Sequence, residues 1–402
     1  MNSILKSVIG LRVKGSCISG TFIRTLAGCA AEAPRKKEFP RTMKMSGWEI
    51  HSYGGIDELQ FSDNIRIPQI QQGSEVMIRI KAASINPLDV DMIGGYGAAL
   101  LNTLRRGDIE FPLRLGRDFV GEVIYRGIGA PRNIKLGDTV WGVVPVHKQG
   151  CHSEYLVTDS SYISHKPQSL SDQEASGVLY AGLTAWSGLF LSGDLGNVCN
   201  MLRSGGRSEK KKRVLILGAS GGVGSMAVQI ARYEKAQVFA TASADAKELL
   251  SQLGVDTAID YRDEQFLSQI HSHGPYDIIL DCAGYGPTFA STIKCDFTSY
   301  VTFSSPLLKN TDSHGLLGGS IRNAMSLIEE NAKGRVQNTG RGTVKWGYFL
   351  PMKLGIEYLK KLADRNQLQC VVDSVYGFDR AIEAYQRVKD GHLRGKIILD
   401  LS

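Results

Sequence analysis

The stretch that decides the fold is Arg213-Val-Leu-Ile-Leu-Gly-Ala-Ser-Gly-Gly-Val-Gly-Ser225. Its apolar run 214–217 is typical of a buried parallel strand, and the glycines after it lead into a helix that we expect to begin near Ser225. Glycines let a backbone approach a pyrophosphate closely, and a helix N-terminus supplies N–H groups and a positive dipole end. Ala219 replaces the middle glycine of G-x-G-x-x-G, so a loop that merely joins strand to helix is the alternative. We assign a dinucleotide's pyrophosphate to Ser220, Gly221, Gly222, Val223 and Gly224.

Downstream of this loop, strand-like and helix-like segments alternate. Short apolar runs recur, and the stretches between them are long enough for helices such as 246–253. Alternation of this kind predicts a doubly wound parallel sheet, and therefore an α/β fold. The further predicted strands are 238–242, 255–259, 276–281 and 300–303.

The 402-residue chain is long enough for two domains, and its charge is unevenly distributed. Residues 1–41 contain eight Lys or Arg and two Glu, a net charge of +6, which leaves +1 of the total +7 for the rest. The nearly neutral body argues against nucleic acid as a partner. Before the first acid, Glu32, basic residues are interleaved with Ser, Thr and apolar residues, as in a mitochondrial transit peptide. We predict the mitochondrial matrix, with a disordered basic tail as the alternative for 1–41.

The cysteines indicate a reducing compartment. There are seven, an odd number, and they are scattered without a C-x-x-C pair, so we expect reduced thiols. The uncharged segment 175–193 reaches membrane-spanning length, but glycines and serines dilute it. A buried helix is the better interpretation of that segment.

The two ends of the chain have β character. Residues 48–168 contain short strands punctuated by glycine, such as the alternating run 76–82, which predicts a partly open barrel. Near the C-terminus, 379–389 predicts a helix with Ala381, Ala384, Tyr385 and Val388 on one face, and an apolar strand follows up to Leu399. A single strand cannot stand alone, so this end must return to one of the two sheets. The polar, glycine-rich segment 307–344 predicts no clear element.

Several short motifs, taken together with the glycine loop, carry a family resemblance. In this order over 45–402 they resemble the medium-chain dehydrogenase/reductase superfamily, in its quinone-oxidoreductase branch. The other motifs are Asn86-Pro-Leu-Asp89, Leu115-Gly-Arg-Asp-Phe-Val-Gly121, Gly137-Asp-Thr-Val-Trp-Gly142, Tyr180-Ala-Gly-Leu-Thr-Ala-Trp186 and Gly391-His-Leu-Arg-Gly-Lys396.

The resemblance implies how the domains are arranged. A GroES-like substrate domain is expected from both ends of the chain, 45–170 and 346–402, with a Rossmann domain at 171–345 between them. The resemblance also implies NADPH as the cofactor, bound in a cleft where the two domains meet.

Zinc is the first question about the chemistry, because the alcohol-dehydrogenase branch uses it. A catalytic zinc ion needs three converging Cys, His or acidic ligands. The resembling positions hold Asn86, where that branch has cysteine, and Arg117, where it has histidine. We predict no metal, and we interpret Cys151 and His152 as a surface pair rather than a ligand pair.

Without a Lewis acid, a nicotinamide delivers hydride to an acceptor that is already electrophilic, such as a quinone or an enone. The protein then positions the ring and the acceptor and excludes water. By resemblance, Asn86 and Asp89 act in catalysis and Thr184 binds the nicotinamide end of the cofactor. Their ordinary roles would be an Asn-Pro turn, a helix N-terminal acid and a helix-interior threonine.

Tyr96 is a candidate proton donor. The superfamily's enoyl-thioester reductases carry a tyrosine shortly after the same Asn-Pro-x-Asp motif, and here it stands one residue nearer. A phenol of pKa ~10 can protonate a developing enolate or hydroquinone oxygen. The alternative is a loop aromatic that packs on the substrate. The segment 98–110, with Arg105 and Arg106, is expected to cap the cleft.

The residues after the second Rossmann strand bear on cofactor choice. NAD enzymes place an acid there, whereas NADP enzymes place groups that accept a phosphate. Asp245 is an acid in this region and would favour NAD if it contacted the ribose. We interpret it instead as a first-turn acid of the helix that contains Lys247. By resemblance, His392, Leu393 and Arg394 also reach the cofactor. A 2′-phosphate is expected to bind Ser243, Lys247, Tyr261 and Arg262.

Three functions follow. The leading one is a zinc-independent, NADPH-dependent oxidoreductase that reduces a quinone or a conjugated carbonyl; the resemblance points to coenzyme Q (ubiquinone) biosynthesis. The second is reduction of enoyl thioesters, with Arg105 and Arg106 contacting an acyl carrier protein. The third is an NADPH-sensing binding protein that acts through a partner such as a reticulon. Related reductases pair through the edge of the Rossmann sheet, so a homodimer is a further expectation.

Overall fold

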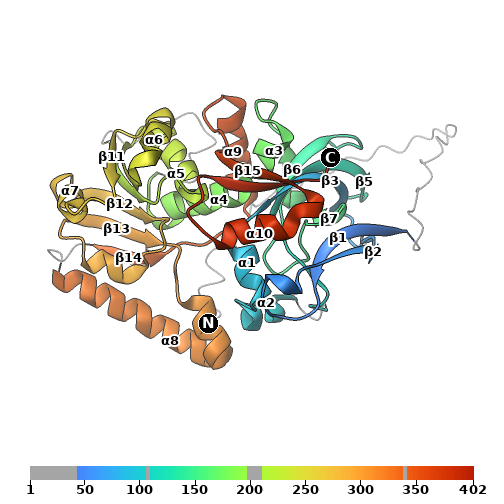
Figure 1. The fold of residues 1–402 in the computed structure, drawn as a ribbon, viewed down its shortest axis with the longest axis horizontal. Coiled ribbons are helices and arrows are strands. Elements are labelled where there is room, and N and C mark those ends of the chain that lie inside the picture. The colour runs from blue at the N-terminus through green and yellow to red at the C-terminus, as the bar shows by residue number, and fades with distance from the viewer. Residues whose placement is uncertain (1–42, 106–108, 197–210, 338–341) are drawn as a thin grey trace, which may run out of the picture. The chain divides into compact units, whose positions relative to one another are not determined.

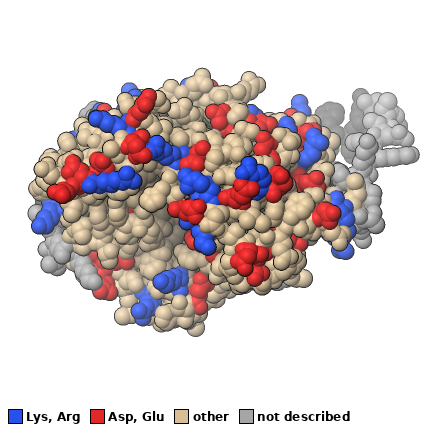
Figure 2. Space-filling model, in the orientation of Figure 1, with Lys and Arg blue, Asp and Glu red and all other residues tan. Residues whose placement is uncertain are grey.

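The computed structural model describes residues 43–105, 109–196, 211–337 and 342–402, with side chains omitted at 333–337. The predicted transit peptide, 1–41, lies outside these ranges. In the view of Figure 2, Lys and Arg are interspersed with Asp and Glu rather than gathered into one basic patch. That distribution is consistent with the nearly neutral charge of the body.

The Rossmann sheet has six parallel strands in the order β11-β10-β9-β12-β13-β14 (Figure 1). The strand order reverses at β9, whose neighbours β10 and β12 continue in opposite directions, and the glycine loop follows β9 at this switch point. The α/β prediction is therefore confirmed. The strands are β9 Arg213–Leu217, β10 Gln237–Ala242, β11 Thr257–Asp260, β12 Tyr276–Asp281, β13 Phe297–Thr302 and β14 Thr343–Trp346.

Helices cover this sheet and explain its apolar strands. The four residues 214–217 of β9 are fully buried, because apolar clusters lie on both faces of the sheet. The helix after the glycine loop begins at Gly222, three residues before the predicted start, since Gly221 is the extended N-cap residue. The helices that link the strands are α5 Gly222–Tyr233, α6 Lys247–Leu253 and α7 Phe266–Ser272.

The second domain is a partly open, GroES-like β-structure. One sheet runs β15-β16-β3-β5-β6-β8, with β7 also paired to β3, and a smaller sheet runs β2-β1-β4. In β3 the residues Val76, Ile78, Ile80 and Ala82 are buried, as the alternation predicted. The strands are β1 Lys44–Ile50, β2 Gln60–Arg66, β3 Glu75–Ile85, β4 Leu113–Arg114, β5 Asp118–Arg126, β6 Thr139–Val143, β7 Tyr155–Asp159, β8 Ile163–His165, β15 Val372–Gly377 and β16 Lys396–Asp400.

The C-terminus returns to the GroES-like sheet, which resolves the choice that the sequence left open. Strand β16 pairs antiparallel with β3, and β15 pairs parallel with β16. Helix α10 Ala381–Lys389 buries the four residues predicted for its inner face. This return brings the turn 391–395, just before β16, next to the glycine loop.

The uncharged segment 175–193 is largely buried, as predicted, although Leu191 is exposed. It contains the end of α3 Asp172–Ser176, then α4 Leu179–Trp186 and a π-helical turn Ser187–Ser192. Seven of the eight residues of α4 are buried. In the ranges that the structure describes, no helix has the length and apolar character needed to cross a membrane.

Helix α8 Leu307–Gln337 is the largest element that the sequence did not predict. It is kinked at Gly315, whose φ of 69° no helix adopts. Its glycines and scattered polar residues conceal a helical period, so packing against α2 Ala98–Arg105 and β14 must stabilise it. Asp312, before the kink, accepts hydrogen bonds from Gly97 N (2.7 Å) and Ala99 N (3.0 Å) and so caps α2.

We predict that Asp312→Ala lowers the free energy of unfolding by about 1 kcal/mol, because two N–H groups at the start of α2 lose their acceptor. Hydrogen exchange should quicken at residues 97–101. The control is Lys309→Ala, an exposed change one turn away on α8 that should alter neither stability nor exchange. Unchanged exchange in Asp312→Ala would contradict the capping role.

Candidate functional site

The glycine loop is shaped by its own close contacts. Gly218 has a φ of 75°, and a Cβ on Gly224 would lie 2.2 Å from the Gly218 carbonyl oxygen. These two glycines are therefore required by the turn itself. A Cβ on Gly221 would instead meet only the Gly218 oxygen, at 3.6 Å. Gly221 thus presents the open face of the loop.

This open face fits the pyrophosphate of a dinucleotide. Helix α5 starts here without an acid in its first turn, so its positive dipole end is not neutralised. The turn 391–395 closes over the loop, with Gly395 N donating to Ser220 O at 3.0 Å. A Cβ on Gly222 would lie 3.0 Å from the Lys396 side chain. The glycine loop thus meets the turn 391–395 and the aliphatic part of the Lys396 side chain from the second domain.

The residues predicted for the 2′-phosphate gather at the ends of β10 and β11. Ser243 is the N-cap of the short 3-10 turn Ala244–Ala246, and Tyr261 N donates to Ala242 O at 3.2 Å. The Arg262 guanidinium lies 5.5 Å from the centroid of the Tyr261 ring. Lys247 is exposed at the start of α6. The structure thus brings the four predicted residues to one edge of the sheet.

Asp245 is a first-turn acid, as expected, but of the 3-10 turn Ala244–Ala246 that leads into α6 rather than of α6 itself. It lies in the 3-10 turn before α6 and forms an ion pair with Arg394, while Glu248 is the first-turn acid of α6. The pair is exposed, and it brings Arg394 to the end of β10, where the ribose of the cofactor is predicted to lie. Of the neighbouring residues in the turn, His392 is exposed with a φ of 50° and Leu393 packs against apolar residues of the GroES-like domain.

Asn86 and Asp89 are buried at the start of α1 Pro87–Ile93, where they form a capping box. Asn86 N donates to Asp89 Oδ2 at 2.9 Å, and Gly116 N donates to Asp89 Oδ1 at 2.8 Å. The Arg117 guanidinium lies 3.4 Å from the same carboxylate. With no exposed surface, Asp89 holds two motifs together rather than contacting a substrate.

A buried polar cluster around Asn86, formed with Asp118 and Lys396, was not predicted from the sequence. Lys396 Nζ donates to Asn86 Oδ1, and Asn86 Nδ2 donates to Asp118 Oδ1 at 3.0 Å. Tyr180 N donates to Asp118 Oδ2 at 3.1 Å, and Lys396 Nζ lies 5.9 Å from the centroid of the Tyr180 ring. The available signal was a charged residue at the head of each apolar strand, Asp118-Phe-Val and Lys396-Ile-Ile.

The positive charge of Lys396 offsets part of the free-energy cost of burying the Asp118 carboxylate. Burial raises the pKa of Asp118, while the Lys396 charge and hydrogen bonds from Ser84 and Asn86 oppose that rise. Both side chains are almost fully buried, so removing one partner would leave the other charge uncompensated.

We predict that Lys396→Met lowers the free energy of unfolding by about 3 kcal/mol, because Asp118 is left buried without its cation. The double variant Lys396→Met/Asp118→Asn should recover most of this loss. Chemical denaturation of the wild type, both single variants and the double variant gives the coupling energy. Strictly additive losses would contradict the pairing.

The position that resembles a zinc-ligand histidine, Arg117, is instead a structural arginine. Arg117 is fully buried and donates to the carbonyl oxygens of Lys148 (2.9 Å) and Pro145 (3.2 Å). Over the ranges described, no three His, Cys, Asp or Glu side chains are grouped as a metal ion requires. The residues at these positions therefore do not fit a zinc ion.

Cys151 and His152 do not form the surface pair that we expected, because both are fully buried. His152 Nδ1 lies 2.8 Å from the Tyr385 hydroxyl, and Nε2 lies 3.1 Å from Ser84 O. A neutral imidazole satisfies both contacts by accepting at Nδ1 and donating at Nε2. Burial lowers the pKa of His152 below its usual value. The residues next to Cys151 and His152 in the sequence form no pattern from which this burial could be predicted.

This lowered pKa predicts a pH dependence. The unfolded chain binds a proton at His152 more readily than the folded chain, so stability falls as pH drops below about 6.5. The loss attributable to this residue approaches about 1.4 kcal/mol per pH unit. Thermal unfolding between pH 7 and 5 should therefore depend less on pH in His152→Gln than in the wild type. The exposed change His271→Gln serves as control, and equal slopes in all three proteins would contradict the assignment.

Tyr96 is half-buried in the loop between α1 and α2. Its backbone N donates to Asp91 O at 3.2 Å, and Asp312 of α8 holds the next residue. Burial raises the pKa of Tyr96, with added contributions from the Asp91 and Asp312 carboxylates. The phenol is therefore protonated at neutral pH and available as a donor.

Aromatic side chains from separate segments approach this part of the site. Tyr180 stacks on Phe349, with ring centroids 4.4 Å apart. Burial raises the pKa of Tyr348, and the nearby Tyr96 raises the pKa of Tyr348 further. Thr184, on α4, donates from Oγ1 to Tyr180 O at 2.7 Å. The predicted nicotinamide-end residues thus adjoin a mostly aromatic surface.

Arg105, in the segment 98–110 that we expected to cap the cleft, is buried. Its guanidinium forms an ion pair with Glu110 at 2.6 Å and donates to His147 O at 3.2 Å. Arg105 is therefore not available to an acyl carrier protein. Arg106, the other predicted contact, lies outside the described residues.

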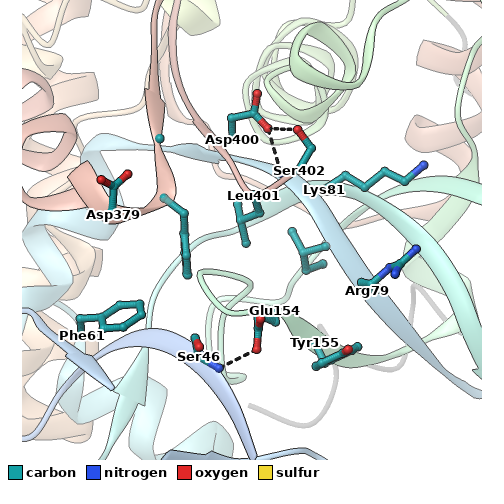
Figure 3. Close-up of a pocket in the computed structure, with 13 residues that line it drawn as sticks. Ser46, Phe61, Arg79, Lys81, Glu154, Tyr155, Asp379, Asp400, Leu401 and Ser402 are labelled. Carbon is teal, nitrogen blue, oxygen red and sulfur yellow. Dashed lines mark hydrogen bonds between the residues drawn. The ribbon is translucent and has the colours of Figure 1, made fainter. Parts of the chain in front are cut away.

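A cavity of about 740 Å³ lies elsewhere, on the GroES-like domain (Figure 3). Its lining includes Phe61, Glu154 and the C-terminal residue Ser402, and charges of both signs. None of the predicted site residues lines it.

Family models match both domains of the chain. Residues 72–170 match the alcohol dehydrogenase GroES-like domain, and residues 253–399 match a model described as zinc-binding dehydrogenase. The mitochondrial NAD(P)H oxidoreductase RTN4IP1 of Drosophila melanogaster is 47% identical over 89% of this chain and 86% of its own length. The chain belongs to the medium-chain dehydrogenase/reductase superfamily. It is accordingly an oxidoreductase, and with its named relatives we place it in the mitochondrion.

Other members of the superfamily show its range. The mitochondrial reticulon-4-interacting protein 1 of Caenorhabditis elegans is 30% identical over 89% of this chain and 96% of its own. The 2-methylene-furan-3-one reductase of Solanum lycopersicum is 28% identical over 99% of this chain and 93% of its own. The quinone oxidoreductase structure from Coxiella burnetii, 24% identical, covers 90% of this chain and all of its own with a TM-score of 0.69. At that identity, the structural likeness shows the fold alone.

Proposed function

We propose that this protein is an NADPH-dependent, zinc-independent oxidoreductase of the mitochondrial matrix that reduces a quinone or another conjugated carbonyl compound. The observation that carries the proposal is the replacement of zinc-ligand positions by Asn86 and Arg117, both bonded into the scaffold of the GroES-like domain. The family resemblance supports a role in coenzyme Q biosynthesis.

This chemistry needs little from the protein beyond positioning. NADPH, when bound, supplies the hydride, and a quinone or enone is electrophilic enough to accept it without a metal. Ser220 to Gly224 and Arg394 would hold the phosphates, Thr184 would border the nicotinamide end, and the buried Asn86 would position Lys396 and Asp118 behind it. The capping segment, held by Arg105 and Glu110, would exclude water from the reacting atoms.

Cofactor choice follows from the charges at the end of β10. The ion pair with Arg394 removes Asp245 as a free acceptor for a ribose hydroxyl, which favours NADPH over NADH. Ser243, Lys247, Tyr261 and Arg262 supply donors for a 2′-phosphate. A protein that binds NADPH only as a sensing ligand would use the same contacts.

We predict that Lys247→Ala lowers kcat/KM for NADPH about tenfold or more and leaves the value for NADH unchanged, since a charge-assisted bond to the 2′-phosphate is lost. Steady-state kinetics with both cofactors measures the ratio. The control, Lys135→Ala, removes an exposed lysine of the GroES-like domain and should change neither value. Equal losses for both cofactors would contradict the assignment.

Enoyl-thioester reduction is the second candidate, and Tyr96 separates it from the first. A phenol held near the substrate can protonate the enolate that forms when a conjugated double bond is reduced. The tomato relative, by its name, reduces such an enone. The burial of Arg105 removes one of the two cations expected to dock a carrier protein, so we favour small conjugated acceptors.

This choice is tested by measuring turnover of the full chain with NADPH under anaerobic conditions. The acceptor is either a short-chain quinone or an enoyl thioester. We expect many turnovers with the quinone. In Tyr96→Phe, enoyl reduction should fall at least about hundredfold and quinone reduction only slightly. Tyr125→Phe, in the GroES-like sheet, is the control. Stoichiometric NADPH binding without turnover on either acceptor would overturn the enzyme proposal in favour of a sensing protein that acts through a partner such as a reticulon.

A further inference from the structure

Three of the five residues in the turn 391–395 have left-handed backbone conformations. Gly391, His392 and Gly395 have φ angles of 74°, 50° and 91°. A non-glycine residue such as His392 holds this conformation only where neighbouring contacts compensate for its strain. Gly395 N donates to Ser220 O at 3.0 Å, so the conformation of the turn also decides how it meets the glycine loop. The contacts that hold the turn in place therefore bear on the cofactor site.

One carboxylate is linked to both ends of this turn. Asp373 Oδ2 accepts from Arg394 N at 2.9 Å and from the Arg387 guanidinium at 3.1 Å. Arg387 also donates, from its other terminal nitrogen, to Gly391 O at 2.8 Å. The Asp373 side chain is only 14% exposed, so water competes little for these bonds. Asp373 thus connects the first and the fourth residue of the turn, one through Arg387 and one directly.

An irregularity in β15 explains how this carboxylate reaches the turn. Strand β15 pairs parallel with β16, and the register shifts by one residue between Val372 and Ser374. Asp373 is therefore the extra residue of a β-bulge, a feature that often re-aims a side chain beside a functional site. The strand lies alongside α10, which carries Arg387 (Figure 1). Strand and helix together hold the turn that precedes β16.

The turn in this conformation carries the Arg394 side chain across to the Rossmann domain. Arg394 forms an ion pair with Asp245, in the 3-10 turn that follows β10. The backbone N–H of Arg394 is thus held by Asp373 of the GroES-like domain, while its guanidinium reaches the predicted ribose end of the cofactor site. A shift of the backbone at residue 394 would displace the guanidinium from that end.

We infer that Asp373 is a positioning residue for NADPH, which sets the turn 391–395 through the Arg394 N–H and through Arg387. The inference rests on the proposed function, because it takes NADPH to bind where the turn meets the glycine loop. A site whose groups are already in place binds its ligand more tightly, since less conformational freedom is lost on binding. A carboxylate has no hydrogen to donate to a phosphate, so Asp373 acts through the turn and not by contact.

The direction of the effect separates positioning from electrostatics. A nearby negative charge opposes phosphate binding, so removal of the Asp373 charge would by itself strengthen NADPH binding. Positioning predicts the opposite for Asp373→Ala, a rise of about tenfold in the dissociation constant for NADPH, because a charge-assisted bond to the turn is lost. Asp373→Asn keeps an acceptor for Arg394 N and should stay within about threefold of the wild type.

Isothermal titration calorimetry of the full chain with NADPH measures these constants. Asp373→Thr, which favours a β-strand and is too short to reach Arg394 N, should match Asp373→Ala and replaces it if the alanine variant does not fold. The matched control is Glu383→Ala, which removes an ion pair with Arg380 at the opposite end of α10 and should change nothing. Unchanged or tighter NADPH binding in Asp373→Ala and Asp373→Thr would overturn the inference.

Kinetics and a double variant distinguish positioning from a general loss of structure. With a short-chain quinone, Asp373→Ala should raise KM for NADPH and leave kcat within about twofold, because the turn holds no residue of the nicotinamide end. Adding Asp373→Ala to Arg394→Ala should raise the dissociation constant by less than the product of the two separate effects. A rise equal to that product would contradict action through Arg394.

Hydrogen exchange of the cofactor-free protein tests the turn without reference to NADPH. Exchange at residues 391–394 should quicken in Asp373→Ala and remain unchanged in Glu383→Ala. Unchanged exchange in Asp373→Ala, in a protein whose wild type binds NADPH, would overturn the inference and leave the proposed function intact. A wild type that binds no NADPH would overturn the proposed function and the inference with it.

Discussion

The site depends on the contacts of one lysine that is buried between the two domains. Lys396 stands at the head of β16, reaches Asn86 on one side, and lies against the glycine loop on the other. An ammonium group in such a place is unfavourable unless a counter-charge and hydrogen bonds accompany it, and Asp118 and Asn86 supply both. The cluster therefore fixes the C-terminal strand, the Asn-Pro helix and the strand β5 relative to the cofactor loop.

This arrangement explains how a fold used by zinc enzymes accommodates a different chemistry. The positions that resemble zinc ligands are occupied by an amide and a guanidinium, and both are bonded to the scaffold. What remains at the junction is a cradle for phosphates, a mostly aromatic surface and one protonated phenol. Such a site suits acceptors that react once they are oriented and shielded from water, without a metal ion to polarise them.

The local pattern of apolar residues in the sequence was sufficient to predict much of the fold. The buried strands of a parallel sheet are continuous apolar runs, so β9, β10 and β12 could be located almost to the residue, and α10 was correct on all four inner residues. Helix α8 was missed because its stability comes from contacts with α2 and β14, which the one-dimensional sequence does not display. The division of the chain at 170 and 345 remains a proposal.

The site was less predictable than the fold, since burial and pairing are long-range properties. Lys396 and Asp118 lie in motifs that were recognised, yet their link through Asn86 joins segments that are far apart in the chain. His152 was placed on the surface because nothing in its neighbours revealed that Tyr385 and Ser84 would enclose it. Asp245 similarly required Arg394, 149 residues away, before its role could be assigned.

The claim that both domains build one cofactor site is tested most directly by hydrogen exchange of the full chain with and without NADPH. The account predicts that residues 218–224 and the exposed turn 391–395 gain protection together and at the same NADPH concentration. Protection confined to the glycine loop, with the turn unchanged at saturating NADPH, would contradict it.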